Sequence, residues 1–227
     1  MRSAVRLVAW LVGIVLIPSI LGSIAGSIGL VLGSLGMIGA VLWIWLWLPR
    51  SAHGAFERGR WNVAARRYRV LGVVTRSDDR SRAAQLSRIG CAIAAARLDA
   101  ADRMLATIDA ATLDVQERAV WLNNRACIVI ARGGDAHSAL ALADEATMLR
   151  PDVPALQHTR GMALLAVGRI DDAIAVLDKM RAAGELSPRL EADRCKDLAT
   201  AWAKKGETAY ADDYRLRAEA LSPRPGA

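Results

Sequence analysis

Two different hydrophobic patterns divide the chain near Pro49. Residues 7–48 contain no charged side chain and form an almost continuous apolar run. One straight helix of this length would reach about 63 Å at about 1.5 Å per residue, which exceeds a hydrocarbon core of about 30 Å. The pattern therefore predicts two transmembrane passes joined as a helical hairpin, near residues 6–22 and 27–48.

The turn of this hairpin is expected between Pro18 and Ser27, where residues that weaken helices collect. Arg2 and Arg6 flank the first pass, further arginines follow the second, and the loop between them has no Lys or Arg. The positive-inside rule then predicts a multi-pass protein of the inner cell membrane, with its N-terminus and the rest of the chain in the cytoplasm. Three tryptophans fit the aromatic belt of the same interface: Trp43, Trp45 and Trp47.

A cleaved signal peptide is the alternative interpretation of residues 1–25. The chain starts with basic residues, and Ser23 and Ala25 have the small side chains of a cleavage site. In that case the segment 27–48 would still span the membrane. The basic residues after it would still hold the rest of the chain in the cytoplasm.

Small residues recur on one face of the apolar segment, at alternating intervals of four and three positions. A stripe of this kind lets membrane helices approach closely. It either packs the two passes against each other or docks on a membrane helix of another chain, which includes a homo-oligomer. The stripe consists of Gly22, Gly26, Gly29, Gly33, Gly36 and Ala40. Its first members lie in the expected turn, so the second pass could begin as early as Gly22.

Beyond about residue 55 the chain has a helical pattern, with no strand-like alternation and with Gly or Asp between helical stretches. One sequence motif recurs five times. It consists of a turn residue, a short polar stretch and an alanine, followed four positions later by a residue that is bulkier in most copies. The recurring alanines are Ala64, Ala101, Ala139, Ala173 and Ala211. This spacing predicts a helix-turn-helix unit, in which alanine allows a close helix crossing and glycine forms the turn.

The repeated unit resembles the tetratricopeptide repeat family. Residues 120–151 match best, with Gly134 at the turn, Ala139 and Ala146 as packing residues and Pro151 at the end. Residues 152–182 match next best, at Gly161, Gly168, Ala173 and Met180. The resemblance implies an all-α fold in which the hairpin is followed by a right-handed α-solenoid of about five helix pairs.

The outer repeats depart from the family pattern. The first has no separate first helix unless residues 50–58 supply a short one, the second has Ala96 in place of the turn glycine, and the fifth has Arg215 at an apolar position. The expected organisation is a transmembrane hairpin, a basic juxtamembrane segment with the first half-repeat, a repeat domain and a disordered tail. These regions cover residues 1–49, 50–76, 77–221 and 222–227.

The formal net charge of +7 at first suggests a nucleic-acid partner. However, residues 1–76 contain nine arginines against Glu57 alone, so the basic excess lies next to the membrane. Such clusters attract anionic lipid headgroups and orient the chain during insertion. The expected headgroup contacts are Arg50, Arg58, Arg60, Arg66, Arg67 and Arg69. Nucleic-acid binding through residues 58–76 is a weaker alternative, and the lipid bilayer is the expected partner.

The resemblance also implies a binding groove lined by the first helix of each pair. These helices are expected near residues 81–95, 119–132, 154–167 and 190–205. The candidate groove residues are Trp121, Asn124, Arg125, Arg132, His158, Lys196 and Lys204. Asn can bridge a peptide backbone, and Arg or Lys can pair with carboxylates, so an acidic segment of a protein partner is a fitting ligand. We expect a scaffold or adaptor, and the alternative is a structural subunit of an oligomeric membrane complex assembled through the glycine stripe.

Catalytic chemistry has little support in the sequence. Cys91, Cys127 and Cys195 lie far apart without zinc-site spacing or a disulfide framework. No nucleophile motif or acid pair accompanies His53, His137 or His158, and no glycine-rich phosphate loop is present. We therefore expect no enzymatic activity, no cofactor and no metal.

Overall fold

The computed structural model describes residues 2–75, 77–182 and 184–221, so the expected tail at 222–227 lies outside the described residues. No strand occurs in these three ranges, which confirms the all-α prediction. Contacts group the chain into two compact units. The first comprises Met1–Phe56 with Arg60–Arg88, and the second comprises Glu57–Gly59 with Ile89–Ala227.

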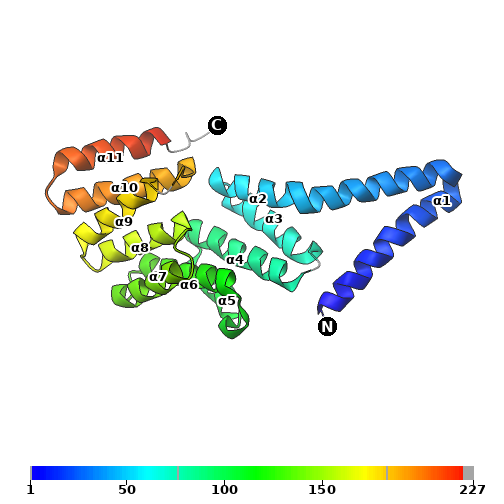
Figure 1. Ribbon diagram of the computed structural model, residues 1–227, viewed down its shortest axis with the longest axis horizontal. Helices are drawn as coiled ribbons and strands as arrows, with labels where there is room; N and C mark the ends of the chain where they lie inside the picture. Colours follow the sequence, from blue (N-terminus) through cyan, green and yellow to red (C-terminus); the bar gives the residue numbers. More distant parts are fainter. Residues whose placement is uncertain (1, 76, 183, 222–227) are drawn as a thin grey trace. The chain divides into compact units, whose positions relative to one another are not determined.

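The first unit begins with helix α1 (Arg2–Leu42), which is interrupted once. The backbone leaves the helical conformation at Ala25 and Gly26, and Gly26 has a φ of 61° and a ψ of −146°. Only glycine adopts this region at little steric cost. The interruption lies within the segment where the turn is expected, while Pro18 stays inside the helix. Two arms of α1 extend from this point (Figure 1).

The apolar helix continues past Pro49, where the predicted membrane segment ends. A π-helical turn (Trp43–Trp47) leads directly into α2 (Leu48–Glu57). The Leu48 N–H donates to the Trp43 carbonyl, five residues back. The wider π turn accommodates Pro49, which has no N–H and whose ring would collide with a regular helical carbonyl. α2 is a short helix over most of the segment 50–58, where the sequence left a first helix open.

One helix of the described chain is long and apolar enough to cross a membrane, and it lies near the N-terminus. It runs over Val15–Glu57, and its most apolar window has a mean hydropathy of 2.1 with 6% of the residues buried. A core helix of a soluble domain would bury most of such a window. The exposed apolar surface therefore favours a membrane-facing segment.

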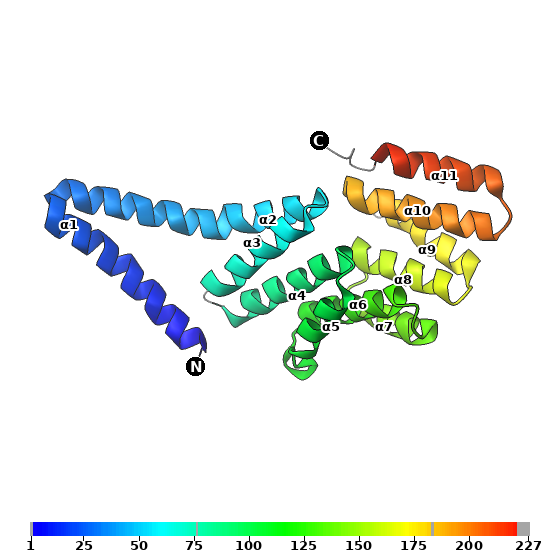
Figure 2. The same cartoon turned by 180° about the vertical axis from the view of Figure 1, so that it is seen from behind.

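The remaining α-helices follow in chain order. They are α3 (Trp61–Val74), α4 (Asp78–Ala94), α5 (Leu98–Ala106), α6 (Val115–Ala131), α7 (Ala136–Leu149), α8 (Pro154–Ala166), α9 (Ile170–Ala182), α10 (Pro188–Lys204) and α11 (Thr208–Leu221). In the second unit each helix from α5 to α11 packs on the next, and α8 also contacts α6 and α10 (Figure 2). The five recurring alanines are all buried, as their place at helix crossings requires. α6 begins earlier than predicted because Asp114 and Glu117 form a capping box.

The same turn joins the two helices of a pair five times in the described chain. A residue in the left-handed region precedes a backbone N–H that donates to the carbonyl five residues back, which is the Schellman arrangement. The left-handed residues are Gly59, Ala96, Gly133, Gly168 and Gly206. The donors that follow them make bonds of 2.8 to 3.0 Å. In the third turn the left-handed residue is therefore Gly133, not Gly134 as predicted, and Gly134 supplies the donor.

Ala96 is the non-glycine member of this set, with a φ of 54°. Its Cβ makes the left-handed conformation less favourable by roughly 1–2 kcal/mol. Glycine removes this steric cost, but it also makes the unfolded chain more flexible, which offsets part of the gain in stability. Ala96→Gly is expected to stabilise the protein by about 0.5–1 kcal/mol, measured by chemical unfolding of the full chain. Ala100→Gly, inside α5, should instead destabilise it by a similar amount. A loss of stability in both variants would contradict the assignment of Ala96.

The core of the second unit is built from alanine and leucine side chains of α6 to α10. Gly161 on α8 is buried, and a Cβ there would lie 2.6 Å from Cδ2 of Leu177 on α9. Leu177 is fully buried and has little room to move. The glycine that matched the repeat family by position thus lets α8 and α9 approach closely.

Candidate functional site

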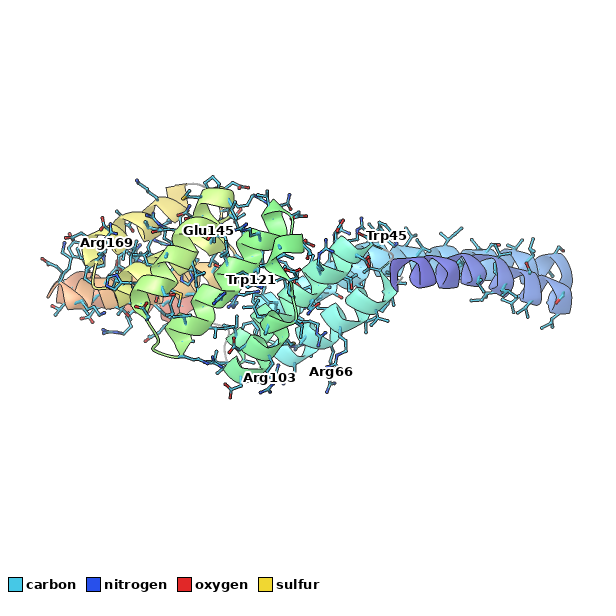
Figure 3. The ribbon with its side chains drawn as sticks, turned by 90° about the horizontal axis from the view of Figure 1, so that it is seen from below. Trp45, Arg66, Arg103, Trp121, Glu145 and Arg169 are labelled. Carbon is cyan, nitrogen blue, oxygen red and sulfur yellow. The ribbon has the colours of Figure 1, made fainter. Side chains whose placement is uncertain are left out.

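The predicted groove residues on α6 have two different environments. Trp121 is half-buried, and the exposed Arg125 lies over its ring with Cζ 5.3 Å from the ring centroid. Asn124 is only 5% exposed, and its Oδ1 lies near Gly90, where a Cβ would be 3.8 Å away. Trp121 and Arg125 therefore form an accessible aromatic and cationic pair (Trp121 is labelled in Figure 3). The amide of Asn124 faces the protein interior.

Two further candidates lie close to carboxylates within the second unit. Arg132 Nη2 lies 2.7 Å from Asp99 Oδ1, and its Nη1 lies 2.8 Å from Asp102 Oδ2. The hydrogen bonds to Asp102 and Asp99 raise the pKa of Arg132 above its ordinary value. His158 Nε2 lies 2.8 Å from Asp197 Oδ2, which connects α8 to α10. Both side chains thus link helices to one another.

The last two candidates share a groove of about 630 Å³ between α10 and α11. Lys196 and Lys204 line it together with Arg215, and Glu219 adds one carboxylate. Lys196 Nζ lies 3.3 Å from Asp193, and Lys204 Nζ donates to the Leu165 carbonyl at 3.3 Å. The sequence marked Arg215 only as a departure from the repeat pattern, because it stands where the repeat is usually apolar. Its place beside the two lysines depends on how α11 packs on α10.

The predicted headgroup arginines also fall into two groups. Arg50 Nη1 donates to the Leu46 carbonyl at 3.1 Å. Arg67 Nη1 donates to the Ser51 carbonyl at 2.7 Å, and its Cζ lies 5.4 Å from the Trp47 ring centroid. These two arginines contact the helix that continues the apolar segment. The other four are exposed: Arg58, Arg60, Arg66 and Arg69.

A pocket of about 320 Å³ lies in the first unit, where α3 and α4 border the end of the apolar helix. Trp45 is labelled there in Figure 3. Arg80 of α4 stacks on this ring with Cζ 3.8 Å from the centroid. Arg80 was not among the predicted site residues, because 35 positions separate it from Trp45 and no local pattern connects them.

The glycine stripe is divided by the interruption of α1. A Cβ at Gly29 would overlap the Leu21 carbonyl oxygen, and one at Gly33 would lie 2.9 Å from the Pro18 Cα. A Cβ at Gly22 would likewise lie 3.1 Å from Leu30 Cδ1, so these three glycines sit where the arms approach each other. Gly26 forms the interruption itself. Gly36 has open space around it, and Ala40 is exposed.

Potential metal ligands do not cluster in the part of the chain that the structure describes. No three His, Cys, Asp or Glu side chains in it lie close enough to hold a metal ion. None of the three cysteines, all of them described, forms a disulfide. Burial raises the pKa of the Cys127 and Cys195 thiols, which disfavours the nucleophilic thiolate.

No protein-family model, curated protein or solved structure matches the chain. The functional interpretation therefore rests on the residues and contacts of the chain itself. The tetratricopeptide resemblance stays a prediction from the repeat spacing.

Proposed function

We propose that this protein is a membrane-anchored scaffold of the tetratricopeptide type that binds another protein through its helical repeats. The observation that carries the proposal is the same helix–turn–helix connection repeated along the chain. The first of these connections directly follows an exposed apolar helix. Repeats of this kind offer an extended surface for a partner and do not need an enclosed catalytic cavity. The contacts of α8 with both α6 and α10 are those expected between first helices of a solenoid.

The anchor of this proposal is a hairpin with two membrane passes. Residues 7–24 and 27–48 would reach roughly 27 Å and 33 Å as helices, close to a hydrocarbon core of about 30 Å. The close approach of the two arms at Gly29 and Gly33, next to the bend, supports a hairpin, and the arms diverge further from it (Figure 1). Arginines before the first pass and after the second favour a cytoplasmic N-terminus and repeat unit at the inner membrane.

The partner surface combines cations with an aromatic ring. Trp121 and Arg125 lie on α6, and the groove between α10 and α11 holds Lys196, Lys204 and Arg215. Arg and Lys side chains bind carboxylates through charge-assisted hydrogen bonds, and an indole ring supplies apolar contact area. An acidic protein segment therefore suits this surface best.

The charge-reversal variant Lys196→Glu/Lys204→Glu tests this assignment. Tagged full-length protein is isolated from native membranes, and the co-purified proteins are quantified by mass spectrometry. We expect at least one cytoplasmic protein to fall about tenfold or more, since two attractive contacts, each worth about 1 kcal/mol or more, become repulsive. Lys179→Glu/Arg181→Glu, on the exposed surface of α9, is the matched control and should retain that protein.

An unchanged set of partners in the groove variant, or equal loss in both variants, would contradict the groove. The orientation is checked independently with a reporter enzyme that is active only outside the cytoplasm. Fused after Ala227, it should remain inactive, and activity would overturn the cytoplasmic placement.

The second candidate function is that of a structural subunit of an oligomeric membrane complex. Open space around Gly36 and the exposure of Ala40 favour it, because small residues on a free helix face suit contact with another membrane helix. In that case the repeats would form a cytoplasmic collar around the assembly.

A further inference from the structure

The pocket beside Trp45 combines an apolar lining with one cation. Ile44 and Trp45 come from the end of the apolar helix, Leu71 from α3, and Arg80 and Ala83 from α4. The neighbouring tryptophans Trp43 and Trp47 stack on each other with centroids 5.4 Å apart and are largely exposed. Exposed tryptophans at the end of an apolar helix are typical of the boundary between hydrocarbon and headgroups. The pocket therefore lies at headgroup depth if the helix spans the membrane.

Arg80 is an exposed cation that stacks on an aromatic ring. Its guanidinium stacks on the Trp45 ring at 3.8 Å, which engages the planar face and leaves the N–H donors at its edge available. No carboxylate pairs with Arg80 in residues 2–75, 77–182 and 184–221. Arg82, two positions later, lies instead 2.5 Å from Asp79. Arg80 thus presents a cation to the pocket that an anion can neutralise.

We propose that this pocket binds an anionic phospholipid, with the phosphodiester against the Arg80 guanidinium and the upper part of an acyl chain against Ile44 and Leu71. Arg and phosphate form strong, oriented hydrogen bonds, and the apolar walls suit a hydrocarbon chain. The lining carries the hydroxyl groups of Tyr68, Thr75 and Ser87 beside its single cation, but it is mainly apolar, which favours a lipid over a free phosphate ion. The site rests on the membrane anchoring proposed above and adds a defined lipid to it.

The test uses full-length protein in detergent, stripped of lipid and titrated with phosphatidylglycerol or phosphatidylcholine while bound lipid is counted by native mass spectrometry. Wild-type protein is expected to bind one phosphatidylglycerol in preference to phosphatidylcholine. Arg80→Gln should weaken this binding about tenfold, as loss of a charge-assisted hydrogen bond predicts. Ala83→Leu, which fills the pocket without changing its charge, should weaken it as well.

Arg66→Gln is the matched control, because Arg66 is exposed on α3 and extends away from it (Figure 3). It removes the same charge and should leave affinity within about twofold, as expected for an exposed charge in high dielectric. Equal weakening by Arg80→Gln and Arg66→Gln would show a diffuse basic surface and overturn the pocket. So would equal binding of the two lipids, or displacement of phosphatidylglycerol by inorganic phosphate.

Carbonate extraction of native membranes separates this proposal from the anchoring on which it rests. If wild-type protein stays in the membrane while Arg80→Gln binds phosphatidylglycerol normally, the pocket assignment fails and the anchor stands. If carbonate releases wild-type protein, the anchoring itself fails. Circular dichroism of each variant confirms that the helices are intact.

Discussion

Replacing Arg194 with alanine is expected to lower the free energy of unfolding by about 3–5 kcal/mol. Arg194 is among the most deeply buried side chains of the second unit, with 1% exposed. Its Nε and Nη2 each donate to a Glu191 carboxylate oxygen at 2.7 Å, and Nη1 donates to the Leu177 carbonyl at 3.3 Å. Alanine would leave a cavity, a partly buried carboxylate without its partner and an unsatisfied carbonyl. The bonds also connect α10 to α9, so their loss weakens helix packing.

Chemical unfolding of the full-length protein in detergent, followed by circular dichroism, measures this change. Arg169→Ala is the control, because Arg169 pairs with Asp172 at 2.7 Å while both side chains are 55% exposed (Arg169 is labelled in Figure 3). Exposed pairs of this kind contribute at most about 1 kcal/mol. Equal effects of the two substitutions would show that Arg194 is not a buried structural residue.

The Arg194 variant also has a predicted pH signature. The hydrogen bonds from Arg194 lower the pKa of Glu191 below its usual value in the folded state. A carboxyl group with a lowered folded pKa stabilises the protein above its unfolded pKa, about 4.3 for Glu. This contribution disappears as the pH falls below that value through the folded pKa. The stability difference between wild type and Arg194→Ala should therefore narrow below about pH 4.

Gly29→Leu is expected to destabilise the packing of the two arms of α1 by about 3 kcal/mol or more, at the upper end of overpacking costs. Even a Cβ at Gly29 would overlap the carbonyl oxygen of Leu21. Since this oxygen belongs to the backbone, a rotamer change cannot relieve the collision, and the arms would have to separate. Unfolding of the full-length protein in mixed detergent micelles measures the loss.

Gly36→Leu is the matched control for this prediction. It makes the same change on the same helix, but a Cβ at Gly36 meets nothing within 4 Å. The change in unfolding free energy should be within about 0.5 kcal/mol, as for an unconstrained surface position. Equal destabilisation by Gly29→Leu and Gly36→Leu would contradict the contact between the arms.

The Gly36 variant also separates the two proposed functions. If the protein is a structural subunit, Gly36→Leu combined with Ala40→Leu should reduce the size of the complex in mild detergent, because it blocks close contact with another helix. If the protein is a scaffold, the size should stay the same and the partner should still be captured. Gly29 and Gly33 cannot make this distinction, because their substitution disturbs the arms of the same chain.

The sequence by itself determined the features that depend on local pattern. The apolar run, the interruption near Gly26 and, to within one residue, the helix turns follow from hydrophobicity, backbone freedom and hydrogen bonds between residues at most five positions apart. The five alanines are buried as expected. A small side chain that recurs once per repeat indicates the point where two helices cross closely. The continuation of the helix through Pro49 was not predicted, since proline usually ends a helix and a π turn leaves no pattern in the sequence.

The tertiary structure alone decided the partners of the charged side chains. Arg132 was predicted to line the groove but pairs with Asp99 and Asp102. Arg80 was not predicted as a site residue and stacks on Trp45. A long charged side chain can reach water, a carboxylate or an aromatic ring, and the choice depends on which helix packs beside it. Residues 30 or more positions apart in sequence make these contacts. Periodicity along the chain places a residue on a helix face, but it does not identify the group that the residue meets there.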